Sequence, residues 1–188
     1  MARRLDQALI IDVESTCWDH KPPPGEVSEI IEIGLARVDL VTLERIDKRA
    51  IIVRPQKSNV SAFCTQLTSL TQDEVIRGIT LNEAFRILRT EYDSENRLFV
   101  SWGDYDRNQF HRNCGDYGLK YPFGPTHLNI KTLFSISFGI DVELGLDEAM
   151  KRLGLPLEGR HHRGVDDAWN IAEVFCAVMR RIRCGSGA

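Results

Sequence analysis

The sequence lacks the features that would place the chain in a membrane, in an oxidising compartment or on long nucleic acid. No apolar run approaches the length of a membrane span. The net charge of -3 offers no broad basic face for long nucleic acid, so a polyanionic substrate would have to be held locally. No Cys-x-x-Cys pair occurs, and the cysteines are odd in number, so we expect reduced thiols, no disulfides and a cytoplasmic location. The five are Cys17, Cys64, Cys114, Cys176 and Cys184.

Length and composition are those of an ordinary globular protein. The chain has 188 residues, of which 43% are apolar and 27% are charged, and this is sufficient for one domain with a substantial core. No internal repeat, low-complexity tract or long Pro/Gly linker divides the sequence. We therefore expect a single domain over residues 1–188, with a core at about residues 8–183 and a frayed tail at Cys184–Ala188.

The hydrophobic pattern predicts an α/β fold in which helices flank a mixed sheet. The expected strands are Ala8–Thr16, Ile30–Val38, Ala50–Val53, Leu98–Trp102 and His127–Ile130, and the first three form an antiparallel meander. Capping boxes begin at Thr71 and at Thr80, and the second opens a helix. Further helices are expected after Asp104, at about Leu146–Leu153 and at about Val165–Ile182.

Two carboxylates one residue apart, Asp12 and Glu14, end the first apolar strand. Alternation along a strand places both on the same face. Because adjacent acids repel each other, such a pair usually persists where a hard cation such as Mg²⁺ or Mn²⁺ binds between them. Two further Asp-x-Glu copies, at Asp93 and at Asp141, do not end an apolar strand. The context of the first copy favours a metal-dependent enzyme that acts on phosphates.

A second acidic site follows the strand that ends near Trp102, and helical spacing distinguishes its two aspartates. Asp106 shares a helix stripe with Phe110 and Cys114. Asp104 precedes the helix and is better placed to cap it. We therefore favour Asp106 as the group that faces the site.

A third site contains two overlapping His-x4-Asp matches, His161 with Asp166 and His162 with Asp167. Asp167 borders the apolar face of the following helix beside Ile171, whereas Asp166 lies on its wet side. A lone aspartate in the first helical turn could simply favour the helix dipole. Four acids at the ends of core strands or the starts of helices, with a histidine five residues before the last, favour a functional site instead.

At these residues the sequence resembles the DEDDh branch of the 3′-to-5′ exonucleases, and within it the exonucleases that trim histone mRNA and small RNA. The resemblance spans roughly Leu9 to Val178. It rests on Ile11-Asp12-Val13-Glu14-Ser15-Thr16-Cys17, Glu29-Ile30-Ile31-Glu32-Ile33-Gly34, Phe63-Cys64-Thr65-Gln66-Leu67-Thr68, Trp102-Gly103-Asp104-Tyr105-Asp106 and Gly159-Arg160-His161-His162-Arg163-Gly164-Val165-Asp166-Asp167. Two positions depart from the family pattern: Ser15 stands where Ala is frequent, and Ser69 where Gly is usual.

The resemblance implies a ribonuclease H-like fold with a mixed five-stranded sheet flanked by helices. It also implies metal-dependent hydrolysis of phosphodiester bonds from the 3′ end of single-stranded nucleic acid, which releases nucleoside 5′-monophosphates. RNA is preferred over DNA by resemblance alone. Two divalent ions, Mg²⁺ or Mn²⁺, are implied to bind to Asp12, Glu14, Asp106 and Asp167, with His162 as the general base. Activity should then rise with pH as this imidazole loses its proton.

Candidate substrate contacts also come from the resemblance. They are Ser15, Thr16, Leu67, Trp102 and Arg160. Arg160 and Arg163 could bind the substrate backbone or merely solvate their loop, and Trp102 could equally be a core residue. His161 is expected to be an exposed neighbour of the base. The expected partners are 3′ ends of RNA or DNA, with no membrane.

A different class of function follows from two spaced Cys/His pairs. Cys17-x-x-His20 and His111-x-x-Cys114 could together supply four zinc ligands and make the chain a metal-stabilised interaction module. The first pair lies in a loop and the second within a helix, and nothing in the sequence brings them together. A catalytically silent member of the nuclease fold is a third alternative, but all five expected catalytic positions are filled.

Overall fold

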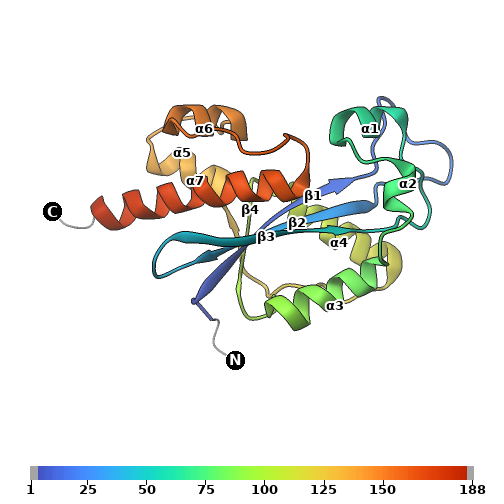
Figure 1. Ribbon diagram of the computed structural model, residues 1–188, viewed down its shortest axis with the longest axis horizontal. Helices are drawn as coiled ribbons and strands as arrows, with labels where there is room; N and C mark the ends of the chain where they lie inside the picture. The colour runs from blue at the N-terminus through green and yellow to red at the C-terminus, as the bar shows by residue number, and fades with distance from the viewer. Residues whose placement is uncertain (1–3, 186–188) are drawn as a thin grey trace.

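The computed structural model describes residues 4–185, and a five-stranded sheet lies at its centre (Figure 1). The strands are β1 (Gln7–Ser15), β2 (Ile30–Asp39), β3 (Glu44–Ile52), β4 (Leu98–Ser101) and β5 (His127–Asn129). Their order across the sheet is β3-β2-β1-β4-β5. β1 and β3 both pair antiparallel with β2, and β4 lies parallel to β1 and to β5. The predicted mixed sheet, with its antiparallel meander, is therefore confirmed.

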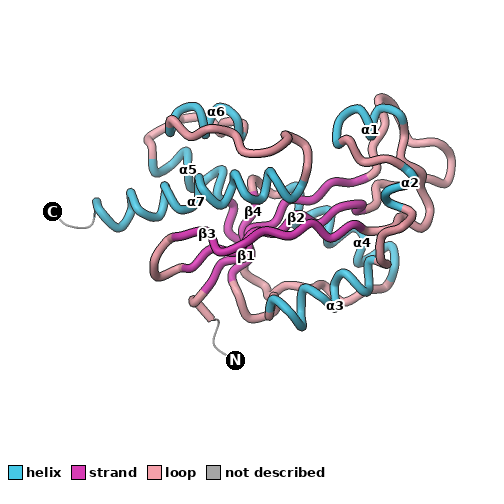
Figure 2. Tube along the Cα trace, viewed as in Figure 1, coloured by secondary structure: helices cyan, strands magenta, loops and turns pink. Residues whose placement is uncertain are grey.

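Helices cover both faces of the sheet (Figure 2). They are α1 (Ala62–Thr68), α2 (Gln72–Val75), α3 (Leu81–Tyr92), α4 (Tyr105–Tyr117), α5 (Ile130–Ser137), α6 (Leu146–Leu153) and α7 (Gly164–Gly185). α5, α6 and α7 pack on one face, and α3 and α4 pack on the other. None of the described helices is long and apolar enough to cross a membrane.

Alternation along β1 divides the core into two layers. Ala8 and Ile10 are fully buried against α5, α6 and α7, whereas Leu9 and Ile11 are fully buried against α3 and α4. The period of two places the side chain of Asp12 on the same face as that of Ile10. The strand therefore carries its acids toward the N-terminal end of α7.

The edge strand β3 begins six residues earlier than the sequence pattern predicted. The expected strand began at Ala50, but the pairing with β2 extends back to Glu44. The first half of β3 is charged and mostly exposed. Edge strands commonly carry such charges, which discourage pairing with other chains, and an apolar pattern does not detect them.

Two helices were missed and one was too short in the prediction. α1 begins at its N-cap Ser61, whose hydroxyl accepts a hydrogen bond from the Cys64 amide at 3.0 Å. α5 follows its N-cap Asn129 directly, and its β-branched residues and alternation resemble a strand. α7 continues through Cys184 and Gly185, so these two residues are not a frayed tail. The rest of the expected tail, residues 186–188, lies outside the described residues.

Both predicted capping sites hold a threonine cap. At Thr80 the reciprocal box is complete, because the hydroxyl accepts from the Glu83 amide and the Glu83 carboxylate accepts from the Thr80 amide. At Thr71 the hydroxyl accepts from the Glu74 amide at 3.2 Å. These local bonds define the starts of α3 and α2, as the sequence indicated.

Candidate functional site

A cavity of about 350 Å³ opens at the C-terminal end of β1 and contains the acids that the sequence singled out. Asp12, Glu14, Asp106 and Asp167 all line it, and so does His162. Glu14, Asp106 and Asp167 are 8%, 3% and 4% exposed, whereas Asp12 is partly exposed. The fold thus brings five residues from β1, α4, the start of α7 and the loop before it into one place.

Asp106 enters the cavity from the first turn of α4. Its carboxylate accepts a hydrogen bond from the Val13 amide at 2.9 Å, which ties α4 to β1 between the two strand acids. The predicted capping role of Asp104 is wrong, because its side chain makes no cap hydrogen bond. Asp104 instead accepts from the Asn129 side-chain amide at 3.2 Å. Its ψ of -4° is not the extended backbone that capping side chains normally need.

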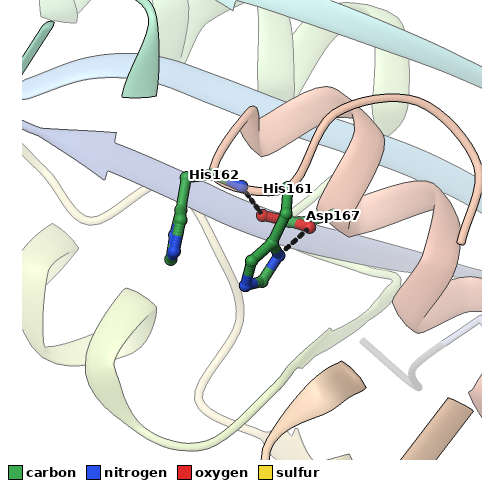
Figure 3. A group of neighbouring side chains, drawn as sticks. All are labelled: His161, His162 and Asp167. Atoms are coloured by element: carbon green, nitrogen blue, oxygen red, sulfur yellow. Dashed lines mark hydrogen bonds and ion pairs between the residues drawn. The ribbon is translucent and has the colours of Figure 1, made fainter. Parts of the chain in front are cut away.

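Asp167 is held by the two histidines that precede α7 (Figure 3). One carboxylate oxygen accepts from the His162 backbone amide at 2.8 Å, and the other lies 3.0 Å from the Nδ1 atom of His161. Asp166 points elsewhere, toward Lys48 at 2.6 Å and the Arg160 amide at 3.0 Å. The position of each aspartate on the helix therefore predicted correctly that Asp167 faces the cavity and that Asp166 does not.

His161 is exposed, as expected, but it also interacts with two carboxylates. Besides its contact with Asp167, its Nε2 atom lies 3.7 Å from the Asp147 carboxylate of α6. The rings of His161 and His162 lie on the same side of Asp167, with centroids 4.0 Å apart (Figure 3). His161 orients the carboxylate, while the His162 ring lines the cavity, with a ring nitrogen within 4.8 Å of the Asp167 carboxylate.

His162 occupies a backbone conformation that non-glycine residues rarely adopt, with φ at 62°. Such strain persists only where the surrounding structure enforces it. Burial and the neighbouring His161 lower the pKa of His162 below 6.5. Its imidazole is therefore neutral at neutral pH and able to accept a proton.

Oxygen ligands suitable for a metal ion converge in the cavity. Asp12, Glu14 and Asp167 each offer an oxygen, and these atoms lie within 4.8 Å of one another. Carboxylate oxygens are hard donors of the kind that Mg²⁺ and Mn²⁺ prefer. The donor set therefore fits the expected divalent ions.

The carboxylates strongly perturb one another. Burial, together with the charges of neighbouring acids, raises the pKa of Glu14 to about 9 and raises that of Asp12 well above 3.8. Burial also raises the pKa of Asp106 to about 7, against the hydrogen bond from the Val13 amide. Acids with such pKa values lack a positive counter-charge, which divalent ions would supply.

A fully buried carboxylate, Glu32 of β2, holds the loop that carries the histidines. It accepts from the Arg163 guanidinium at 3.2 Å, the Gly164 amide at 3.2 Å and the Val165 amide at 3.4 Å. These donors lie at the start of α7, where the helix dipole favours an anion. Arg163 is thus committed to Glu32, which disfavours the substrate backbone as its partner, one of the two alternatives left open by the sequence.

The predicted substrate contacts divide into two groups. Ser15, Leu67 and Trp102 line the cavity, and the buried indole N–H of Trp102 has no hydrogen-bond partner among the described residues. The Thr16 side chain is fully buried, and its hydroxyl donates to the Val27 carbonyl and accepts from the Glu29 amide. Arg160 is exposed and is not among the lining residues. Neither Thr16 nor Arg160 is placed for side-chain contact with a substrate in the cavity.

Ser69, the second departure from the family pattern, has a structural explanation. It is the C-cap of α1 and has φ at 64°, in the left-handed region. Glycine adopts this conformation without steric cost, which accounts for the usual residue there. Ser69 does not line the cavity.

Several lining residues were not found from the sequence. Lys131 follows the N-cap of α5, Tyr105 is the first residue of α4, and Cys17 comes just after β1. Tyr105 lies between Asp104 and Asp106, and this position beside a predicted ligand was a usable signal. Lys131 lies in α5, a helix that the prediction missed, and no motif pointed to it.

The alternative zinc site is not formed. Among residues 4–185, the groups of three or more potential ligands are His161, His162 and Asp167, and Asp12, Glu14 and Asp167. His20 is highly exposed beside Asp19, and the His111 ring stacks on Tyr121 with centroids 4.1 Å apart. The two Cys/His pairs therefore have different surroundings and do not share an ion.

Comparisons with known proteins agree with this geometry. The human 3'-5' exoribonuclease 1 is 32% identical over 93% of this chain, which spans 53% of the human protein. The probable 3'-5' exonuclease KapD of Bacillus subtilis is 28% identical over 90% of this chain and 83% of its own length. A solved nuclease domain of 3'hExo, a DEDDh family member bound to rAMP, is 29% identical with a TM-score of 0.84, covering 96% of this chain and 93% of its own. The family model described as exonuclease (RNase_T) matches residues 9–175, and the chain belongs to that family.

Proposed function

We propose that this chain is a 3′-to-5′ exonuclease that removes nucleoside 5′-monophosphates from the 3′ end of single-stranded nucleic acid, with RNA preferred. The observation that carries the proposal is the convergence of four carboxylates and a neutral histidine in one cavity. Family membership supports the reaction class. The chain spans about half the length of the human relative.

Asp12, Glu14, Asp106 and Asp167 would hold two divalent ions, Mg²⁺ or Mn²⁺. The chemistry that such ions supply when bound is activation of the attacking water and stabilisation of charge on the leaving 3′ oxygen. The protein contributes rigid ligands: Asp106 is oriented by the Val13 amide, and Asp167 by the His162 amide and the His161 ring. Oriented ligands of this kind bind ions with little reorganisation.

His162 would accept the proton of the attacking water. Its ring lines the cavity, and its lowered pKa leaves it unprotonated at neutral pH. A general base of this kind contributes roughly 10²- to 10⁴-fold to the rate. Asp167 and the strained backbone hold the base in position.

The preference for RNA rests on the relatives. The human relative is named an exoribonuclease, and the 3'hExo domain holds rAMP. A cavity of about 350 Å³ suits a strand end more than a duplex.

We further propose that residues 1–188 form a single exonuclease domain with its core at residues 8–183, located in the cytoplasm. In residues 4–185 the five cysteines are free, which is compatible with that location.

Product analysis tests the proposal. The protein is incubated with RNA and DNA oligonucleotides of the same sequence in Mg²⁺, Mn²⁺ or EDTA, and the products are separated by chromatography. We expect nucleoside 5′-monophosphates in either metal, none in EDTA, and faster release from RNA. Release of oligonucleotides from internal cleavage, or of 3′-monophosphates, would exclude the proposed reaction.

A further inference from the structure

The charge of the cavity is poorly matched to a polyanionic strand. Four carboxylates line it, while Lys131 is the one lysine or arginine among its described lining residues. Divalent ions would compensate the acids and the scissile phosphate. Any other phosphate of the strand that enters this negative cavity needs a further cation, because unscreened like charges repel strongly at short range.

Part of the Lys131 side chain lines the cavity. Lys131 is the second residue of α5, immediately after β5. Its Cδ atom lies 3.8 Å from where a Cβ of Gly103 would stand, in the turn between β4 and α4. That turn also carries Trp102, which lines the cavity. The aliphatic part of Lys131 therefore packs beside this turn, and a change of side-chain rotamer would bring the ammonium group, which lies near Glu143, into the cavity.

The ammonium group has only a loose ionic partner in the described structure. Its Nζ atom lies 3.6 Å from the Glu143 carboxylate, beyond hydrogen-bond distance. The Glu143 side chain is 44% exposed, and its other oxygen accepts from the Thr132 hydroxyl. Exposed pairs of this kind contribute little and are easily exchanged. Lys131 can therefore leave Glu143 for a stronger anion at small cost.

The other basic side chains near the site are less suited to this task. Arg163 is bound to the buried Glu32, and Arg160 is exposed outside the cavity. We propose that Lys131 binds a phosphate oxygen of the nucleic-acid strand in the cavity. This inference rests on the proposed exonuclease function and identifies a substrate-binding residue for it.

The proposal is tested by measuring kcat and KM on a single-stranded RNA oligonucleotide at several salt concentrations. Lys131→Met removes the charge and keeps most of the side-chain length, while Lys131→Arg keeps the charge. Lys151→Met, on the exposed face of α6 outside the cavity, is the matched control for loss of one positive charge. Melting temperatures verify that all variants are folded.

We expect kcat/KM of Lys131→Met to fall roughly tenfold to a hundredfold, mainly through KM, as for loss of a charge-assisted hydrogen bond. The plot of log kcat/KM against log salt concentration should become less steep by about 0.7, the value for one phosphate contact on a single strand. Lys131→Arg should recover most of the loss, and Lys151→Met should match the wild type.

Equal KM and equal salt dependence for Lys131→Met and Lys151→Met would overturn the inference and leave the exonuclease proposal intact, since the wild type would still cleave. A loss in Lys131→Arg as large as in Lys131→Met would overturn it too, because side-chain shape and not charge would then be responsible. A wild-type protein that cleaves no oligonucleotide would refute both proposals together.

Discussion

Gly34 of β2 lies directly against Gly164 at the start of α7. A Cβ on Gly34 would stand 1.9 Å from the carbonyl carbon of Gly164, a distance that no real contact permits. The absence of a side chain at Gly34 is therefore what lets the first turn of α7 approach the sheet. That approach places Asp167 beside the acids of β1.

Gly34→Ala should consequently destabilise the protein and displace Asp167. Overpacking a buried contact costs about 1–3 kcal/mol and sometimes more. Gly115→Ala is the matched control, because Gly115 lies within α4 and a Cβ there meets nothing within 4 Å. Alanine in place of this helical glycine should stabilise by about 0.5–1 kcal/mol. Urea unfolding of both variants measures the difference, and similar stabilities would contradict the close-approach argument.

Glu32 should be a major contributor to stability although it is not a predicted metal ligand. Glu32→Ala leaves Arg163 and two backbone amides without their buried partner, and breaking such a buried pair costs about 3 kcal/mol. Glu32→Gln retains an acceptor oxygen and should cost less. Glu44→Ala, at an exposed position of β3, should change stability by less than about 0.5 kcal/mol. A free energy of unfolding for Glu32→Ala equal to that of Glu44→Ala would refute this role.

The acid cluster predicts an unusual pH dependence in the metal-free protein. Glu14 has a pKa of about 9 when folded, against 4.5 for an ordinary glutamate. Between these values the folded state binds more protons than the unfolded state, so stability falls as pH rises. In EDTA the melting temperature should therefore decrease from about pH 5 to pH 9. Mg²⁺ should restore it more at pH 9 than at pH 5, because deprotonated carboxylates bind the ion better.

Glu14→Gln is the control for this pH dependence. The variant cannot lose the proton, so its melting temperature in EDTA should vary less with pH than that of the wild type. A wild-type melting temperature that rises or stays constant through this window would show that the acids are not mutually strained as the structure indicates.

The rate of hydrolysis should rise with pH and reach a plateau. The pKa of His162 is lowered below 6.5 by burial and by His161, and a general base acts only when it is unprotonated. The midpoint of the rise in kcat/KM should therefore lie below pH 6.5. His162→Ala should lose roughly 10²- to 10⁴-fold in rate together with this dependence. The His111 ring stacks on Tyr121 and does not line the cavity, so His111→Gln should keep the wild-type pH dependence of kcat/KM. A flat wild-type profile, without a change in rate-limiting step, would remove His162 as the base.

The sheet and the main acids could be predicted because they depend on local patterns. Alternation in β1 assigned Asp12 and Glu14 to one face, and the helix stripes separated Asp106 from Asp104 and Asp167 from Asp166. These arguments need only the period of a strand or a helix. The boundaries of α6 followed in the same way from its amphipathic pattern.

What the sequence could not provide depends on contacts between distant segments. Lys131 reaches the cavity only because β5 lies beside β4 and α5 starts next to the Gly103 turn. Thr16 resembles a substrate contact by its place in the motif, but tertiary hydrogen bonds to the Val27–Glu29 segment occupy its hydroxyl. The role of Glu32 is likewise set by donors more than a hundred residues away in the chain.

The most direct test of the account uses 5′-labelled single-stranded RNA in Mg²⁺ with the wild type, Asp12→Asn and Asp141→Asn. Asp141 belongs to a second Asp-x-Glu copy, exposed and outside the cavity, and therefore matches the chemical change without touching the site. We predict a ladder that shortens from the 3′ end for the wild type and for Asp141→Asn, and no shortening for Asp12→Asn. Equal cleavage by Asp12→Asn and the wild type, or no cleavage by any of the three, would contradict the assignment of this cavity as the active site of an exonuclease.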